Sequence, residues 1–226
     1  MSVLITGGSG NLGGALVQHF LNSGTSVTTT SHLGSTPVGA ISIAIDLSRP
    51  GSGEELASRL AAEDFKVIIH NAADQSVAEI AQQDSQAIHA MLSTNLASIA
   101  EFTSAWARSK KVPESIIGIS SVEAASARPG HALYGASKAG LSAYLRTAAV
   151  ELAPARVNSI RLGLMDRAGL SEQWPTGVQA WERAVPTGRM GTSADLIQAI
   201  EYLNAASWVT GAELVLDGGL SATAGW

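Results

Sequence analysis

The chain has 226 residues, of which 46% are hydrophobic and 23 are glycine, and its formal charge is −5. This length and composition favour a sizeable core and one domain over residues 1–226 rather than a disordered chain. The acidic balance disfavours a nucleic-acid partner, the absence of long apolar runs argues against a membrane span, and the absence of cysteine excludes disulfides and thiol catalysis.

The chain begins with an apolar run at residues 2–6, a glycine-rich segment from Thr6 to Gly13, and a helical pattern that stops at Gly24. Glycines let a backbone approach a pyrophosphate, and a helix N-terminus offers free N–H groups and a positive dipole end. This order predicts a dinucleotide-binding loop, with a flexible Gly/Ser turn as the alternative. No basic region or hydrophobic signal segment precedes the first strand, so we expect a cytoplasmic location.

Strands and helices alternate along the rest of the chain. The expected strands are residues 2–6, 26–30, 41–45, 66–70, 115–120, 156–161 and 213–217. The expected helices are residues 12–22, 53–63, 84–109, 134–152 and 193–205. This alternation predicts an α/β, doubly wound Rossmann fold with a single, mostly parallel sheet. The segment 162–191 is irregular and contains one weak helical pattern.

Tyr134 and Lys138 stand four residues apart in a helical pattern, so their side chains share one face. An ammonium beside a phenol favours the phenolate, and this gives a tyrosine of ordinary pKa about 10 a working role near neutrality. Ser121 follows the apolar run 116–119, at the strand edge where open α/β sheets bind ligands. Its hydroxyl is expected to hold a carbonyl oxygen while Tyr134 moves the proton. In an arbitrary sequence the same Tyr/Lys spacing usually marks a surface pair.

Taken together, these motifs resemble the short-chain dehydrogenase/reductase family over nearly the whole chain. The segment 6–13 is similar to the coenzyme loop of that family, although Asn11 stands where the commonest subclass has a glycine. Residues 71–73 are similar to a segment that supports the central sheet, and His70 replaces the asparagine before them, where we expect it to pack at a strand end. Residues 156–163 resemble the strand under the nicotinamide, with Leu162 in place of a proline.

The resemblance implies a catalytic tetrad of Asn95, Ser121, Tyr134 and Lys138. Tyr134 would be the general acid in reduction and the base in oxidation. Lys138 would lower the pKa of the tyrosine and hold the nicotinamide ribose. Asn95 is expected to bend its helix and to support a water molecule that leads to Lys138.

The resemblance also implies the residues that contact the coenzyme. They are Gly7, Ser9, Gly10, Asn11, Leu12, Gly13, Ser31, His32, Asp46, Leu47, Asn71, Ala72, Ala73, Tyr134, Lys138, Gly163 and Met165. Asp46 and Leu47 are expected beside the adenine, with a simple helix-capping role as the alternative for Asp46.

The end of the second strand is expected to decide between NAD and NADP. Enzymes selective for NAD commonly place an acidic residue there, which would repel a 2′-phosphate. Ser31 and His32 occupy that position, and no acidic residue lies between Thr25 and Ile45. A serine hydroxyl can donate to the phosphate, whereas a histidine of pKa about 6.5 is a weaker anchor than arginine at pH 7. We therefore expect NADP rather than NAD.

On the substrate side, the residues expected to make contact are Ser121, Glu123, His131 and Trp174. In the resembling family the region 162–191 covers the substrate as a lid, and an ordinary surface connection is the alternative here. His131 is as well explained as an exposed loop residue. No group of histidines and carboxylates has metal-ligand spacing, so we expect no metal, and Ser121 lacks the Gly-x-Ser-x-Gly elbow of esterases.

The favoured function is that of an NADPH-dependent carbonyl reductase or alcohol dehydrogenase acting on a small carbonyl or alcohol. A non-catalytic regulatory protein that binds a dinucleotide is one alternative, and an epimerase or dehydratase of the same family is another. The complete tetrad favours an enzyme over a regulatory protein that only binds a dinucleotide. The short stretch after Leu162 disfavours the epimerases, because those relatives usually carry a larger C-terminal substrate domain.

Association of identical subunits is also expected. The helical segments 84–109 and 134–152 are apolar over a wide arc, which indicates burial on two sides. In the resembling family these helices form a four-helix contact across a two-fold axis, so we expect a homodimer or, with a second interface at the last helix and strand, a homotetramer. The tail 222–226 would then reach a neighbouring subunit. A wider intramolecular core is the alternative.

Overall fold

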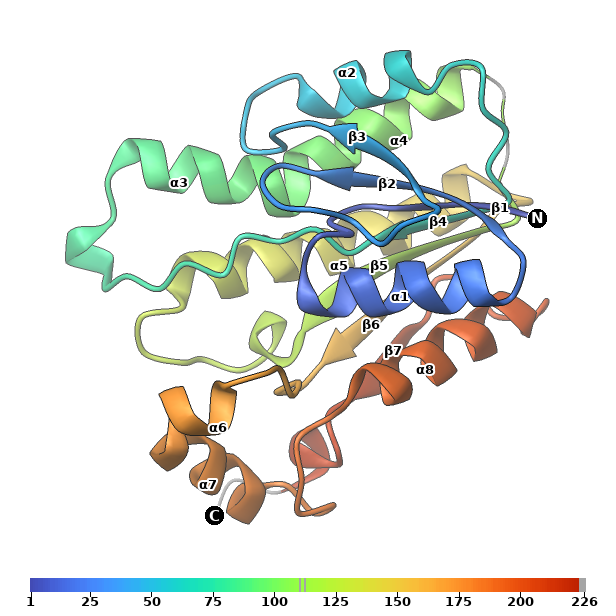
Figure 1. Ribbon diagram of the computed structural model, residues 1–226. Helices are drawn as coiled ribbons and strands as arrows, with labels where there is room; N and C mark the ends of the chain where they lie inside the picture. The colour runs from blue at the N-terminus through green and yellow to red at the C-terminus, as the bar shows by residue number, and fades with distance from the viewer. Residues whose placement is uncertain (110, 112, 224–226) are drawn as a thin grey trace.

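The computed structural model describes residues 1–109, 111 and 113–223 and is built on a sheet of seven parallel strands (Figure 1). The strands are β1 (Ser2–Ile5), β2 (Ser26–Ser31), β3 (Ile41–Ala44), β4 (Val67–His70), β5 (Ser115–Ser121), β6 (Arg156–Leu162) and β7 (Glu213–Leu216). Their order is β3-β2-β1-β4-β5-β6-β7. The predicted fold class is confirmed.

The central strands consist of almost uninterrupted apolar residues because both faces of the sheet are covered. Every residue of β4 and of β5 is buried. On one face lie α1 (Asn11–Asn22) and α8 (Ser193–Ala205), whose apolar sides share a core cluster with β1, β4 and β6. On the other face lie α2 (Ser52–Arg59), α4 (Ser98–Arg108) and α5 (Ala132–Glu151). The result is a three-layer α/β/α arrangement.

The strand order reverses direction at β1, which lies between β2 and β4. The connections leaving β1 and β4 therefore cross to opposite sides of the sheet, and a crevice opens between them at the carboxyl ends of the strands. Crevices of this kind are where open α/β sheets bind ligands. In Figure 1 all the arrowheads point toward this edge, where α6 and α7 also lie.

The helix predicted over residues 84–109 is interrupted by a π turn. It consists of α3 (Ser85–Leu92), a π-helical turn (Ser93–Ala97) and α4, one after the other. A π turn inserts one extra residue and is most often found at functional sites. The extra residue lies around Asn95, whose side chain is completely buried. The expectation that Asn95 bends its helix agrees with this local geometry.

Beyond the strand ends, the irregular segment 162–191 folds into two short helices, α6 (Leu170–Gln173) and α7 (Pro175–Ala184). Leu170, Val178 and Met190 form a small apolar cluster of their own, with Trp181 packed against it. Pro175 opens α7, where its missing N–H costs no helical hydrogen bond. Short 3₁₀ turns occur at Ile80–Gln82, Val122–Ala124 and Leu220–Ala222.

Within the described residues, no helix is long and apolar enough to cross a bilayer. The cytoplasmic location stays a prediction from the sequence.

Candidate active site

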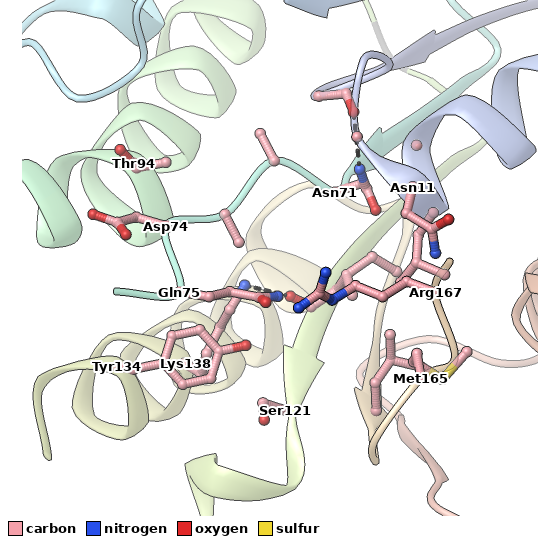
Figure 2. Close-up of a pocket in the computed structure, with 18 of the residues that line it drawn as sticks. Asn11, Asn71, Asp74, Gln75, Thr94, Ser121, Tyr134, Lys138, Met165 and Arg167 are labelled. Atoms are coloured by element: carbon pink, nitrogen blue, oxygen red, sulfur yellow. Dashed lines mark hydrogen bonds between the residues drawn. The ribbon is translucent and has the colours of Figure 1, made fainter. Parts of the chain in front are cut away.

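A cavity of about 1100 Å³ runs along the carboxyl ends of the strands (Figure 2). Ligand pockets typically measure roughly 300–1,000 Å³, so this space is large enough for a coenzyme together with a small substrate. All seventeen expected coenzyme residues line this cavity, as do Ser121, Glu123, His131 and Trp174. Asn95 lies behind the wall. The structure thus gathers the predicted residues around one cavity, while their individual roles stay predictions.

The glycine loop between β1 and α1 brings two backbone segments into close approach. A Cβ atom at Gly13 would lie 2.1 Å from the carbonyl oxygen of Gly7, so no larger residue fits there. Gly10 precedes α1 without supplying a side-chain cap among the described residues. The first N–H groups of the helix therefore remain available, together with the positive end of its dipole. These features fit the pyrophosphate of a dinucleotide.

A hydroxyl group ties the ends of the two central strands together. Thr6 Oγ1 accepts the N–H groups of Asn71 and Ala72, both at 3.0 Å. The Asn71 amide also donates to the Thr6 carbonyl at 3.0 Å. The segment 71–73 thereby holds the floor of the crevice against the glycine loop, consistent with the supporting role expected for it.

Near β2 the cavity is lined by Ser31, His32 and Asp46. The Ser31 hydroxyl donates to the Gly34 carbonyl at 2.9 Å. His32 Nε2 lies 3.8 Å from Asp46 Oδ2, and both side chains are accessible to solvent. Hydrogen bonds from Ser48 hold the pKa of Asp46 below its ordinary value. The sequence analysis gave His32 and Asp46 separate roles, whereas the structure places them next to each other.

Tyr134 and Ser121 face one another across the cavity, the first from α5 and the second from the end of β5 (Figure 2). Burial raises the pKa of the Tyr134 phenol to about 12, opposed by a hydrogen bond with Ser121 and assisted by the negative charge of Glu123. This differs from the expectation that Lys138 lowers the pKa. A phenol that stays protonated at neutral pH is in the correct state to donate a proton.

Lys138 lies one helical turn after Tyr134 and is 2% exposed. Its Nζ donates to the Ile119 carbonyl at 2.8 Å and lies 5.8 Å from the centroid of the Tyr134 ring. Burial lowers the pKa of the Lys138 ammonium to about 8. The hydrogen bond of the ammonium is thus directed at the strand and not at the phenol.

Asn95 connects three parts of the site. Its amide donates to the Asp74 carbonyl and to Ser137 Oγ, both at 2.9 Å, and its oxygen accepts the Asp74 N–H at 2.7 Å. Ser137 precedes Lys138 on α5, and Asp74 belongs to the loop after β4. The π turn therefore fixes the distance between that loop and α5.

Charged and aromatic residues surround the outer end of the cavity. His131 Nδ1 lies 2.7 Å from Glu123 Oε2, an ion-pair contact without hydrogen-bond geometry. Arg128 lies 3.6 Å from the other oxygen of Glu123, and its guanidinium lies 4.9 Å from the centroid of the Trp174 ring. His131 is partly buried, so the fully exposed alternative does not hold. The loop after Ser121 is thus in contact with the segment that contains α6 and α7.

Sequence reasoning missed several residues of the cavity wall, among them Asp74, Gln75, Arg128 and Arg167. Figure 2 shows the Arg167 side chain extending into the cavity from the segment after β6. The sequence did contain a signal for Arg167, because this residue is a cation that follows shortly after a strand leading to the predicted crevice. Asp74 and Gln75 carried no such signal, because the loop after β4 has no pattern of its own.

Sequence comparison matches residues 12–221 with the family model described as enoyl-(acyl carrier protein) reductase. The 3-oxoacyl-[acyl-carrier-protein] reductase FabG of Chlamydia pneumoniae is 28% identical over 97% of this chain and 96% of its own.

Solved structures share the fold. 4-Hydroxyisoleucine dehydrogenase complexed with NADH has a TM-score of 0.88 at 24% identity, covering 99% of both chains. ElxO with NADP bound has a TM-score of 0.86 at 22% identity, covering 98% of this chain and 99% of its own. The family match over most of the sequence, on a fold and a site of the expected form, shows that the chain belongs to the short-chain dehydrogenase/reductase family of oxidoreductases.

Proposed function

We propose that the protein is an NADPH-dependent reductase of small carbonyl compounds that also runs in the direction of alcohol oxidation. One observation carries the proposal. The phenol of Tyr134, the hydroxyl of Ser121 and the side chain of Lys138 line the same cavity as the glycine loop. A dinucleotide-binding sensor has no chemical need for this set of residues.

The nicotinamide of the bound coenzyme would supply or accept a hydride. Ser121 binds the substrate oxygen, and Tyr134 donates its proton to that oxygen as the carbonyl becomes an alcohol. Lys138 stabilises the phenolate that remains, because a nearby positive charge favours the ionised form. Lys138 also holds the nicotinamide ribose. Asn95 positions the Asp74 loop and α5 and supports the water that leads to Lys138.

The preference for NADP rests on the end of β2. Ser31 lines the cavity there, and the first carboxylate after it in the chain is Asp46, which His32 faces at 3.8 Å. An imidazole between this carboxylate and a 2′-phosphate would reduce the repulsion between the two. Both NADH and NADP occur among the fold neighbours, so the assignment depends on these local residues.

The segment 162–191 acts as the substrate lid in this proposal. Arg128 connects Glu123 of the catalytic loop with Trp174 at the start of α7. Glu123, His131 and Arg128 give this end of the cavity several polar groups, which favours a substrate with a polar substituent beyond its carbonyl.

We also propose that the chain forms a homo-oligomer through the exposed sides of α4 and α5, with a second contact at the β7 edge. Val150 is an apolar residue on α5 that is 79% exposed, whereas the other apolar residues of this helix mostly face the sheet. At the other edge, Trp208 is 98% exposed and Tyr202 of α8 is 55% exposed. The expected contribution of the tail 222–226 involves residues 224–226, which lie outside the described residues.

Mixing purified protein with NADPH and a panel of ketones and aldehydes tests the proposed activity, followed as loss of absorbance of the reduced coenzyme. Tyr134→Phe should lower turnover of the best substrate at least about a hundredfold, the usual scale for a general acid, with little change in coenzyme affinity. Tyr144→Phe, on the same helix and outside the cavity, is the matched control. Near wild-type turnover by Tyr134→Phe would contradict the assignment.

The rate of reduction should depend on the charge of Lys138. Its ammonium is present below a pKa of about 8 and is lost above it, so kcat/KM is expected to fall by about tenfold per pH unit above pH 8. Lys138→Arg keeps its charge in this pH range, so its kcat/KM should not fall above pH 8, even if its absolute rate is lower. A wild-type profile that stays flat to high pH would show that this amine does not assist the proton transfer.

Coenzyme preference should follow Ser31. Ser31→Asp places a carboxylate against the 2′-phosphate and should weaken NADPH binding, while NADH is tolerated or improved. Ser31→Ala, which removes the hydroxyl without adding charge, is the matched control. Fluorescence titration of both coenzymes measures the effect, and a wild type that binds NADH more tightly than NADPH would overturn the preference.

Light scattering at micromolar concentration should give a mass that is a multiple of the 23.2 kDa chain. Val150→Asp should lower that mass by charging the α5 face, whereas Trp208→Asp should leave at least a dimer because it affects the other edge. A wild-type mass near 23.2 kDa would contradict the predicted association.

A further inference from the structure

A second cavity of about 200 Å³ lies on the α4 and α5 side of the sheet. Ile68 and His70 of β4 line it, together with Ile116 of β5, Phe102 and Trp106 of α4, and the turn after α5. Among the residues that the structure describes, it shares no lining residue with the coenzyme cavity. It is therefore a separate space within the fold.

On the way to this cavity, α4 is held against the start of α2 by hydrogen bonds and close packing. The Glu101 carboxylate on α4 accepts the N–H groups of Gly51 and Gly53, at 3.1 and 3.0 Å. Gly53 also contacts α4 so closely that a Cβ there would lie 2.0 Å from the Ser98 carbonyl oxygen. The space between α4 and the end of α5 is left incompletely filled.

Aromatic rings form one wall of this cavity. The rings of Phe102 and Trp106 are stacked, with centroids 5.4 Å apart and planes inclined by 17°. Phe65 supports the Trp106 ring from behind, at 5.6 Å between centroids. Opposite them, Ile68 and Ile116 present aliphatic side chains. Such walls suit a flat, apolar ligand.

Three polar atoms on the lining residues lack hydrogen-bond partners in the described part of the chain. They are the Trp106 Nε1–H, the His70 Nε2 and the Thr103 Oγ1, on residues that are 4%, 2% and 5% exposed. Leaving a buried polar group unpaired is costly, so most such groups are paired in folded proteins. The position that the sequence analysis treated as simple packing thus presents an unpaired nitrogen at the end of β4.

The charge state of His70 narrows the kind of ligand. Burial lowers its pKa to about 4, so the imidazole is neutral near pH 7. Lys111 and Glu151 also line the cavity, but the Lys111 ammonium already donates to the carbonyls of Ala61 and Glu63, and Glu151 is exposed. The buried polar groups are a neutral imidazole, a hydroxyl and an indole N–H, which provide hydrogen bonds without charge and so disfavour a charged ligand. An apolar cavity of about 150 Å³ in another protein holds benzene, so the space here admits one aromatic ring with a small substituent.

We propose that this cavity is a binding site for a small uncharged aromatic molecule of the phenol class, whose ring packs on Phe102 and Trp106. The oxygen of the ligand accepts the Trp106 Nε1–H, and His70 provides the second polar contact. The proposal does not depend on the catalytic assignment, because none of these residues takes part in it.

Isothermal titration calorimetry with phenol tests the proposal, with toluene as the apolar probe of nearly the same shape. The wild type should bind phenol at least about tenfold more tightly than toluene, which corresponds to one hydrogen bond. Trp106→Phe keeps a ring and removes the N–H, and should lose about that factor for phenol. Trp174→Phe, in the coenzyme cavity, and the exposed Trp208→Phe are the matched controls and should bind phenol as the wild type does.

Ala155→Leu provides an independent test, because Ala155 lines the cavity and a larger side chain there fills the space without removing a polar group. It should abolish binding of phenol and toluene alike. Thermal melts verify that each variant is folded. Absence of phenol binding at millimolar concentration, equal binding by wild type and Trp106→Phe, or loss of binding in Trp174→Phe would each overturn the proposal.

Discussion

Lys138 carries a primary amine into a region where its side chain is 2% exposed and the Ile119 carbonyl is its hydrogen-bond partner. Ionising a buried amine is costly without further partners, and its lowered pKa expresses this cost. In the proposed mechanism this ammonium assists a phenol that burial keeps protonated. The arrangement is therefore a balance in which two buried groups depend on each other. Everything that positions α5 against β5 also sets this balance, including the contact of Asn95 with Ser137.

The two ends of the large cavity differ in how they are held. At the glycine loop, backbone groups and two short side chains set the shape, because Thr6 and Asn71 link β1 and β4 through hydrogen bonds between a side chain and the main chain. At the outer end, long side chains meet across a loop and two short helices. Backbone-built parts of a protein vary little with the solvent, whereas contacts between long charged side chains are weak and screened by salt. The end at the glycine loop, where we propose that the coenzyme binds, is accordingly expected to be the more rigid one, and the proposed substrate end the more adaptable one.

Much of this fold could be predicted from the sequence, because buried parallel strands such as β4 and β5 contain the short apolar runs 67–69 and 116–119. Tyr134 and Lys138 could be placed on one helix face because their spacing is local, and Ser121 at a strand end because it follows an apolar run. The neighbourhood of His32 and Asp46 was not, since β2 and β3 bring together residues that are distant along the chain. The π turn was missed as well, because a helical pattern with one extra residue still looks helical. The direction of the Lys138 amine, toward Ile119, likewise depends on tertiary packing.

The π turn at Ser93–Ala97 also adds one residue to the helix that continues from α3 into α4. An α-helix advances by about 100° per residue, so one additional residue rotates everything that follows it by that angle. The apolar side of α3 and that of α4 are consequently out of phase along one continuous helix. Shortening the turn by a single residue would turn either Asn95 or the core face of α4 away from its partners. We therefore expect relatives of this chain to tolerate substitutions in the π turn more readily than deletions. A relative that lacks one residue in this turn is expected to have lost the constraint that preserves the site.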